Sequence, residues 1–265
     1  MKKATFLRKM LWLLLIPFIT TSCEDKMDEH YDVPDWVPAS AWEVLQSGEH
    51  GKFSMFLEGV ERAGFKPMLE GKNLLTVMAP DDEAFKSYLN QHGYSSVKDI
   101  PEGEIKKIIG YHLLYYSYNT ENLIDFRPYG QIETDEHAET TAGQYYKHRT
   151  KSADVPSVVT DPNTNKEIMV YHLERFLPVF SYKFFATRKI DAKSNYELFY
   201  PNSTWTGENG FMASNASVKE YGVIANNGYI HTLSQVIEPL ETIYTELKQD
   251  EDYSIFESLY ETIGD

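Results

Sequence analysis

The histidines and the single cysteine are the residues of this sequence with the most distinctive chemistry. The histidines lie at positions 30, 50, 92, 112, 137, 148, 172 and 231. None of them forms a His-x-x-x-His pair or another compact metal-ligand set. The sequence also has no Gly-x-Ser-x-Gly elbow and no glycine-rich phosphate loop. We therefore expect no catalytic residue, no metal site and no cofactor.

One short string resembles a set of calcium ligands. Asp161, Asn163, Asn165 and Glu167 alternate as oxygen ligands do in a calcium loop. The sixth position, however, is lysine rather than glycine, and the twelfth is histidine rather than glutamate. A hairpin turn explains the Asp-Pro-Asn-Thr-Asn sequence just as well. We expect the turn.

Cys23 follows a segment that resembles a signal peptide. Lys2, Lys3, Arg8 and Lys9 precede an apolar stretch at 10–20, which is too short and too interrupted by proline for a membrane span. A lone cysteine behind such a leader resembles a bacterial lipoprotein signal, in which the cysteine is lipidated. The alternative is an ordinary secretory leader, 1–22, with a chance cysteine. The lipoprotein interpretation predicts a membrane anchor in a bacterial cell envelope, at the outer membrane and potentially at the cell surface.

The charge of the chain limits its partners. Residues 23–39 are acidic and contain two prolines, which is typical of an extended tether. The whole chain has a formal net charge of −15, and removing residues 1–22 takes away four positive charges and no negative ones. Nucleic-acid binding requires a basic face, so we expect no nucleic-acid partner.

The pattern of apolar residues predicts helices followed by strands. Ser40 is suited to cap a helix through residue 46, and Phe53, Phe56, Leu57 and Val60 have helical spacing. Segment 73–79 is typical of a strand, 101–110 of a helix, and the aromatic segment 111–118 of a strand. Residues 157–172 predict two strands around a turn, whereas 172–190 fits either a helix or a strand. A helical first third that leads into strands indicates an α+β fold.

Three motifs resemble those of the fasciclin (FAS1) domain family. The first is TVMAPDDEAF at 76–85, which includes Thr76, Pro80, Asp81 and Phe85. The second is the pair Tyr111-His112. The third is NNGYIHTLSQVIEP at 226–239, which includes Asn227, Gly228, His231 and Pro239. The motifs occur in the family's order, and the resemblance covers about residues 40–240. It implies a wedge of two small β-sheets with a helical N-terminal part.

The residues of these motifs could serve the fold or a binding partner. In some animal members of the family, the regions around the Tyr-His pair and the last motif are implicated in receptor binding. Apolar strand residues flank both His112 and His231, so we expect both histidines to be hydrogen-bonded groups in or near the core. For Asp81 we expect a helix N-cap. For Asn227-Gly228 we expect a tight turn between two strands.

The sequence departs from the family pattern in its length. His112 and His231 lie much farther apart than in a compact member, which predicts a large insertion at about 134–207. We expect this insertion to be ordered but dispensable for the fold of the motif core. It is rich in aromatic residues. These could form an exposed platform for a glycan or a protein, or they could cover a small core of the insertion itself.

The C-terminal residues resemble an earlier part of the chain. FSMFLEGVERAG at 53–64 matches YSIFESLYETIG at 253–264. We interpret 241–265 as the start of a second, incomplete repeat of the same kind.

The resemblance implies a non-catalytic adhesion or interaction module, anchored at the cell surface and bound to a protein or glycan ligand. An alternative hypothesis is an accessory glycan-binding protein of an outer-membrane polysaccharide uptake system. No constellation of residues supports a hydrolase.

Overall fold

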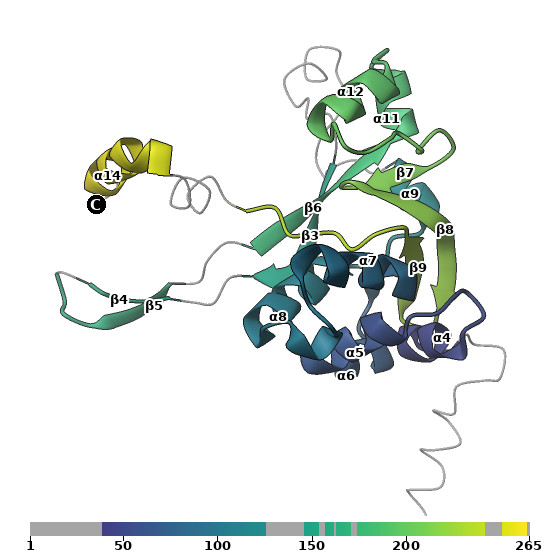
Figure 1. Cartoon of the computed structure of the whole chain (residues 1–265), viewed down its shortest axis with the longest axis horizontal. Coiled ribbons are helices and arrows are strands. Elements are labelled where there is room, and N and C mark those ends of the chain that lie inside the picture. Colours follow the sequence, from purple (N-terminus) through teal and green to yellow (C-terminus); the bar gives the residue numbers. More distant parts are fainter. Residues whose placement is uncertain are drawn as a thin grey trace, which may run out of the picture. The chain divides into compact units, whose positions relative to one another are not determined.

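The computed structural model describes residues 39–125, 146–153, 157–161, 163–170, 174–241 and 251–263 (Figure 1). The predictions for Cys23, for the leader 1–22 and for the tether up to residue 38 lie outside these residues. The helices are α4 (Ala41–Ser47), α5 (Ser54–Arg62), α6 (Lys66–Glu70), α7 (Asp82–His92), α8 (Glu102–Tyr111), α9 (Thr120–Ile124), α11 (Tyr182–Thr187), α12 (Ala192–Phe199) and α14 (Ser254–Ile263). The strands are β1 (Leu75–Pro80), β2 (Leu113–Tyr115), β3 (Tyr146–Ala153), β4 (Ser157–Thr160), β5 (Glu167–Val170), β6 (Glu174–Ser181), β7 (Phe211–Ala213), β8 (Ala216–Ala225) and β9 (Gly228–Leu233).

The predicted α+β class is confirmed, and the first helices begin where their caps predict. Ser40 accepts a hydrogen bond from the backbone of Glu43, and the Glu43 carboxylate accepts one from the backbone of Ser40, which completes a capping box. Gly64 follows α5 in the left-handed conformation, with φ 77°. The predicted strand 111–118 was wrong at its start, because α8 continues through Tyr111.

Seven strands form a closed barrel in the order β1-β2-β3-β6-β7-β8-β9. Strand β1 pairs with β9 in parallel, and the other neighbouring pairs in the barrel are antiparallel. The expected wedge of two small sheets was therefore wrong. The physical reason is that β3 and β6 connect β2 to β7, so the edges that two separate sheets would expose are paired.

The expected insertion at 134–207 is only partly separate from the core. Strands β3 and β6 lie inside this range and are members of the barrel, so the expectation that the range is dispensable was wrong for them. Segment 172–190, whose sequence fits either a helix or a strand, contains β6 and then α11. Pro178 lies within β6 opposite Lys147. The predicted hairpin at 157–172 is confirmed: β4 and β5 form a separate two-stranded sheet.

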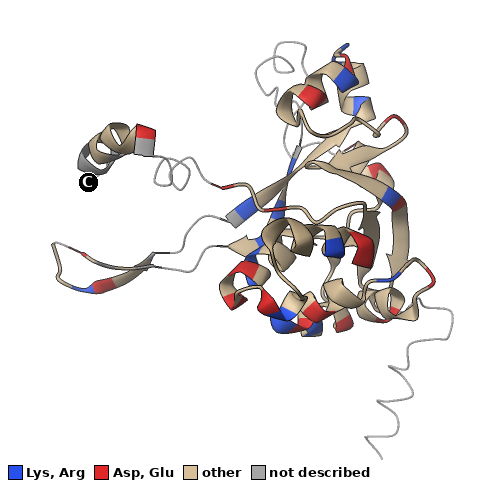
Figure 2. Cartoon of the chain, in the orientation of Figure 1, with Lys and Arg blue, Asp and Glu red and all other residues tan. Residues whose placement is uncertain are grey.

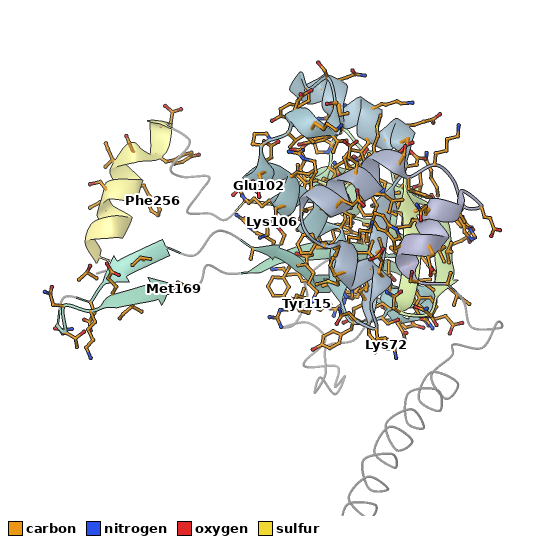
Figure 3. The ribbon with its side chains drawn as sticks, turned by 90° about the horizontal axis from the view of Figure 1, so that it is seen from below. Lys72, Glu102, Lys106, Tyr115, Met169 and Phe256 are labelled. Carbon is orange, nitrogen blue, oxygen red and sulfur yellow. The ribbon has the colours of Figure 1, made fainter. Side chains whose placement is uncertain are left out.

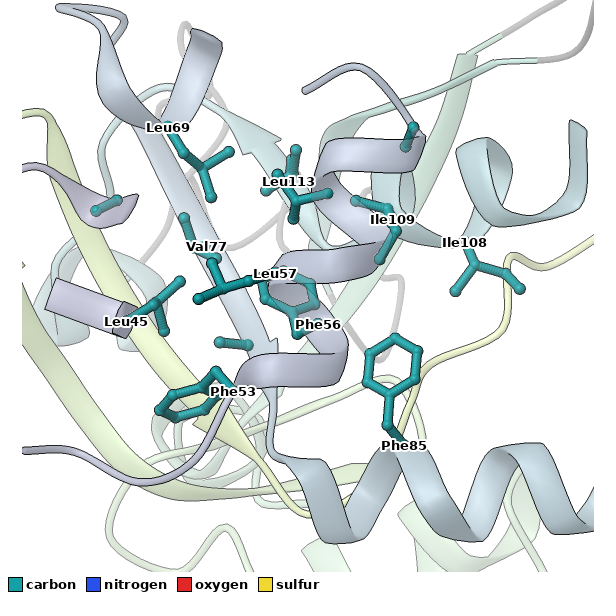
Figure 4. Packing of buried hydrophobic residues seen from close by; sticks show 14 of the residues in the cluster. Leu45, Phe53, Phe56, Leu57, Leu69, Val77, Phe85, Ile108, Ile109 and Leu113 are labelled. Atoms are coloured by element: carbon teal, nitrogen blue, oxygen red, sulfur yellow. The ribbon is translucent and has the colours of Figure 1, made fainter. Parts of the chain in front are cut away.

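Two apolar clusters occupy the two faces of β1. Leu75, Val77 and Ala79 pack against helices α4 to α8, which we call the helical layer. In this layer Phe56 and Phe85 are fully buried (Figure 4). The second cluster takes residues from β1, β2, β6, β7, β8 and β9, so it fills the interior of the barrel; its members are Met78, Tyr111, Leu114, Leu123, Leu177, Val179, Phe211, Ala213, Ala216, Leu233 and Ile237. This division follows from the alternation of side chains along a strand.

The aromatic residues of the expected insertion form a third cluster. Phe180, Phe184, Phe185, Tyr196 and Trp205 are all buried together with Met212. Three of their ring pairs meet edge to face, among them the Phe185–Trp205 pair with centroids 5.4 Å apart. For these five aromatic residues the structure supports a small core of their own, whereas Phe176, Tyr182 and Phe199 of the same range are exposed.

Helix α14 carries the sequence that resembles α5, but its apolar side chains differ in exposure. Phe56 of α5 is fully buried, whereas the matching Phe256 of α14 is 56% exposed. The interpretation of 241–265 as the start of a second repeat remains a prediction. Among the described helices, none combines the length and the apolar character needed to cross a membrane.

We predict that replacing residues 154–173 with a short Gly-Ser linker leaves a cooperative thermal transition within ~2 °C of the wild type. The β4–β5 hairpin pairs only with itself among the described strands, and ~1 kcal/mol corresponds to ~2–4 °C for a domain of this size. Replacing all of 134–207 should abolish the transition, because it removes β3 and β6. Circular dichroism during heating measures both; a cooperative melt of the larger deletion would contradict the role of these strands.

Candidate functional site

The first motif forms the corner between β1 and α7. Pro80 is the last residue of β1 and pairs with Leu233 of β9. Asp81 has the extended backbone of an N-cap, and its carboxylate accepts a hydrogen bond of 2.9 Å from the backbone of Ala84. The same carboxylate contacts Lys219 of β8. Phe85 is fully buried in the helical layer. Asp81 therefore has the expected cap, together with a contact to β8 that the sequence did not indicate.

Asp82 has a structural role that the sequence analysis missed. One of its carboxylate oxygens accepts from the backbone of Met55 at 2.8 Å, and the other accepts from the Ser54 hydroxyl. Ser54 is the first residue of α5, so Asp82 of α7 caps a second helix that lies far away in the sequence. Only the charge of Asp82 was visible in the sequence, because its partner is set by tertiary structure.

His112 lies in the core directly after α8. Its Nδ1–H donates to the carbonyl of Ile108 at 2.9 Å, and its Nε2 accepts from the backbone of Ile237 at 3.0 Å. A ring that donates through one nitrogen and accepts through the other is neutral, so these two partners fix the tautomer of an uncharged His112. Burial lowers the pKa of His112 to about 4, and the hydrogen bond to Ile108 only partly opposes this.

His231 is held in the same way with the opposite tautomer. Its Nδ1 accepts from the backbone of Gly222 at 3.1 Å, and its Nε2–H donates to the carbonyl of Tyr118 at 3.2 Å. Burial lowers the pKa of His231 to about 4. The expectation of a hydrogen-bonded histidine in or near the core is confirmed for His112 and His231, both of which are fully buried.

The expected turn at Asn227-Gly228 lies one residue earlier. Ala225 pairs with Gly228, so the turn consists of Asn226 and Asn227, and Gly228 begins β9. Gly228 has φ 151°, and a Cβ there would lie 1.8 Å from the carbonyl oxygen of Leu75. The glycine is therefore required by the close approach of two parallel strands, and not by the turn.

The Asn227 side chain connects two segments of the helical layer. Its Oδ1 accepts from the backbone of Ala41 at 2.9 Å, and its Nδ2 donates to the carbonyls of Leu69 and Gly71 at 2.8 and 2.9 Å. The backbone carbonyl of Asn227 accepts from Leu75 at 3.1 Å. A buried side chain with all these partners positions α4 and the end of α6 beside β1 and β9.

Thr76 and Tyr111 also bond to backbone. The Thr76 hydroxyl donates to the carbonyl of Tyr116 and accepts from the backbone of Tyr118, at 2.9 and 2.7 Å. The Tyr111 hydroxyl donates to the carbonyl of Phe176 at 2.9 Å. The motif residues on β1, β9 and the end of α8 thus come together around one pair of strands, and their polar groups are engaged by the fold.

Pro239 lies apart from this group, beside a pocket of about 420 Å³. Tyr88 and Glu104 line the same pocket, and the Tyr88 hydroxyl donates to the Glu104 carboxylate at 3.1 Å. Burial and this carboxylate raise the pKa of Tyr88 far above its ordinary value. Lys107, which also lines the pocket, lies 2.8 Å from Glu241. The polar groups beside Pro239 are therefore engaged in two separate pairs, Tyr88 with Glu104 and Lys107 with Glu241.

The calcium-like string forms the expected turn between β4 and β5. Asp161 accepts hydrogen bonds from the backbone of Asn163 and the hydroxyl of Thr164, and these bonds lower the pKa of its carboxyl. No group of three or more histidine, cysteine, aspartate or glutamate side chains is placed to hold a metal ion within the described residues.

A comparison with protein families agrees with the first two of the three motifs. Residues 51–179 match the model of the Fasciclin domain family, a range that includes the first two motifs and runs from α5 into β6. The third motif, at 226–239, lies outside this match. No curated protein matches the chain.

Among the solved structures, the chain is similar to the FAS1 domain pair of the insect cell adhesion molecule fasciclin I. The identity is 17% and the TM-score is 0.37, over 80% of this chain and 54% of that one. The chain thus spans about half the length of the domain pair that it matches.

We predict that Gly228→Ala lowers the free energy of unfolding by more than ~3 kcal/mol or prevents folding, because its Cβ meets the Leu75 carbonyl. The matched control is Gly93→Ala. Gly93 also has a positive φ, 73°, but a Cβ there meets no atom within 4 Å, so only backbone strain of ~1–2 kcal/mol is expected. Urea unfolding measures the free energy of unfolding of both variants. Equal losses in the two would show that the contact with Leu75 adds nothing to the cost of the substitution at Gly228.

We predict that the free energy of unfolding falls as the pH drops from 7 to 5. His112 and His231 have folded-state pKa values of about 4, below the ordinary histidine value of 6.5, so the unfolded state binds more protons in this range. Their stabilising contribution is present above pH 6.5 and is lost as the pH falls toward 4. Between pH 7 and 5, each histidine should lower the free energy of unfolding by about 2 kcal/mol.

Urea unfolding of His231→Gln at pH 7 and pH 5 tests this. The pH-dependent loss should be smaller by about 2 kcal/mol than in the wild type, since one titrating group is gone. Leu123→Ala removes a buried side chain without a titratable group, so it should lower stability equally at both pH values. A His231→Gln variant with the full wild-type pH dependence would be the contrary result.

Proposed function

We propose that this chain is a non-catalytic adhesion or interaction module, held in a bacterial cell envelope by a lipid on Cys23. The observation that carries the proposal is the engagement of the motif groups. His112, His231, Thr76 and Asn227 are buried, and each bonds to backbone of the fold. A general base must reach a substrate proton, and these histidines instead donate to and accept from fixed backbone groups. The motifs thus serve as a scaffold for surfaces that bind.

The family match supports the same proposal. The Fasciclin domain matched by residues 51–179 is a type of cell adhesion and interaction module. A fold of this kind does not by itself identify the partner. The leader, the unique cysteine and the acidic tether support attachment to the outer membrane, with the barrel facing outward from the cell.

The alternative, an accessory glycan-binding protein of a polysaccharide uptake system, was motivated by the aromatic residues of the expected insertion. Phe180, Phe184, Phe185, Tyr196 and Trp205 are buried in their own cluster. These five rings are therefore not available to stack on a sugar, and any support for the alternative has to come from other residues.

We predict that a clickable fatty acid labels the wild-type protein in cells and does not label Cys23→Ser. The physical reason is that a thioether-linked lipid requires the only sulfhydryl of the chain. Protease added to intact cells measures the orientation: the wild type should be cleaved if the domain faces outward, whereas a periplasmic control protein should survive. Equal labelling of both proteins would refute the anchor, and full protection of the wild type would refute surface exposure.

A further inference from the structure

The pocket of about 420 Å³ lies where three segments that are distant in the sequence meet. Tyr88 and Glu104 come from α7 and α8, Ser214 and Asn215 form the turn between β7 and β8, and residues 238–241 follow β9. Figure 2 shows acidic residues on α8 and on the segment that follows β9. Pockets that hold small molecules have volumes of ~300–1,000 Å³, so this one suits a small ligand or one end of a longer ligand.

Hydrogen bonds within the fold hold two walls of the pocket. The Glu104 carboxylate accepts from the hydroxyls of Tyr88 and Tyr94, at 3.1 and 2.9 Å. The Glu241 carboxylate accepts from Lys107 at 2.8 Å, which joins the segment after β9 to α8. A pocket whose walls are fixed before binding loses little conformational freedom when a ligand enters, and this favours binding.

The turn between β7 and β8 is fixed at the third wall. Ser214 has φ 52°, in the left-handed region that residues other than glycine rarely adopt. Its hydroxyl is hydrogen-bonded at 3.0 Å to the hydroxyl of Tyr200, which also lines the pocket. The backbone carbonyl of Asn215 accepts from the side chain of Gln235 at 3.0 Å. These bonds position the backbone of Asn215 at the pocket.

The polar side chains of the pocket retain hydrogen-bonding capacity. The side-chain amide of Asn215 makes no hydrogen bond with the described part of the chain, so it offers donors as well as an acceptor. The Glu238 carboxylate is largely exposed, with His92 at 3.5 Å. Glu104 accepts two hydrogen bonds, whereas a carboxylate has about four acceptor sites. The pocket therefore offers mainly acceptors, and these lie on all three of its segments.

Apolar side chains complete the lining. Ile108, Pro239 and Leu240 all line the pocket, and Leu240 is 47% exposed. Small-molecule pockets commonly combine an apolar lining with a few polar groups that fix the orientation of the ligand. A ligand with one apolar face and several hydrogen-bond donors at its edge matches this arrangement.

We infer that this pocket binds uncharged sugar residues at the end of a glycan. The hydroxyls of a sugar ring donate in several directions, which fits acceptors on three segments, and its C–H face fits the apolar lining. An amine would donate from a single atom, and an anion would meet the carboxylates of Glu104 and Glu238. This inference rests on the proposed function as a binding module and names the class of its partner.

The test uses the full-length protein in a detergent without a sugar headgroup. Saturation-transfer NMR titrations measure binding of the methyl glycosides of glucose, galactose, mannose and N-acetylglucosamine. At least one of them should bind with a Kd of ~1–10 mM, as expected for a ligand of this size. Lysinamide and galacturonate, a cation and an anion, should bind at least fivefold more weakly than the best glycoside. Affinity for that glycoside should change less than twofold between 50 and 500 mM salt, because the ligand carries no charge.

The double variant Asn215→Ala and Glu238→Ala should lose at least fivefold in affinity for the best glycoside. The matched control is Asn209→Ala with Glu102→Ala, which changes the net charge equally. Asn209 and Glu102 are exposed and do not line the pocket, and Figure 3 labels Glu102 on α8. The control should bind within twofold of the wild type. Thermal melts identify a variant that fails to fold; in that case the single variant Glu238→Gln, with an expected loss of at least threefold, decides.

Three results would overturn the inference: no binding of any of the four glycosides by the wild type, tighter binding of lysinamide or galacturonate, or equal losses in the two double variants. Fatty acid labelling of the same proteins reports the anchor separately. Lack of glycoside binding with intact labelling would contradict the sugar ligand and leave the proposed anchor standing.

Discussion

The fold depends on the contact between β1 and β9, the one parallel pair among the barrel strands. Parallel neighbours cannot be joined by a tight turn, so these strands come from distant parts of the chain. At the start of the pair, the backbone of residue 228 approaches the carbonyl of Leu75 so closely that no side chain fits between them. Barrel closure and the position of the helical layer both follow from this contact, because Asn227 bonds to Ala41, Leu69 and Gly71 beside it.

The polar residues of the motifs bond to buried backbone groups that lie outside the regular strand pairing of the barrel. Irregular connections next to a core leave backbone groups without partners, and an unpaired buried group costs ~1–3 kcal/mol. His112 and His231 each bond to one backbone donor and one backbone acceptor, a combination that a neutral imidazole provides and an apolar side chain does not. The motifs therefore specify the scaffold.

Sequence patterns were sufficient for local features and insufficient for features set by distant contacts. The cap at Ser40, the cap at Asp81 and the hairpin of β4 and β5 follow from residue types within a few positions, and all were predictable. The length of the segment between His112 and His231 suggested one large insertion. The strands in it were not evident, because β3 is polar on both faces and β6 contains Pro178. Both strands pair within the barrel nonetheless. The role of Asp82 at the start of α5 and the contact of Gly228 with Leu75 depend on tertiary structure alone.

The position of β9 near the end of the described barrel has a kinetic consequence. At ~5–20 residues per second, β9 is synthesised about 8–30 s after β1, since about 150 residues separate them. Throughout this time one edge of β1 has no partner, and its sequence LTVMAP is apolar and prone to strand pairing. Contacts over such long sequence separations also slow folding. The nascent chain therefore passes through a long interval in which it must be kept from aggregating, so its yield in the cell is set by chaperone capacity as well as by its final stability.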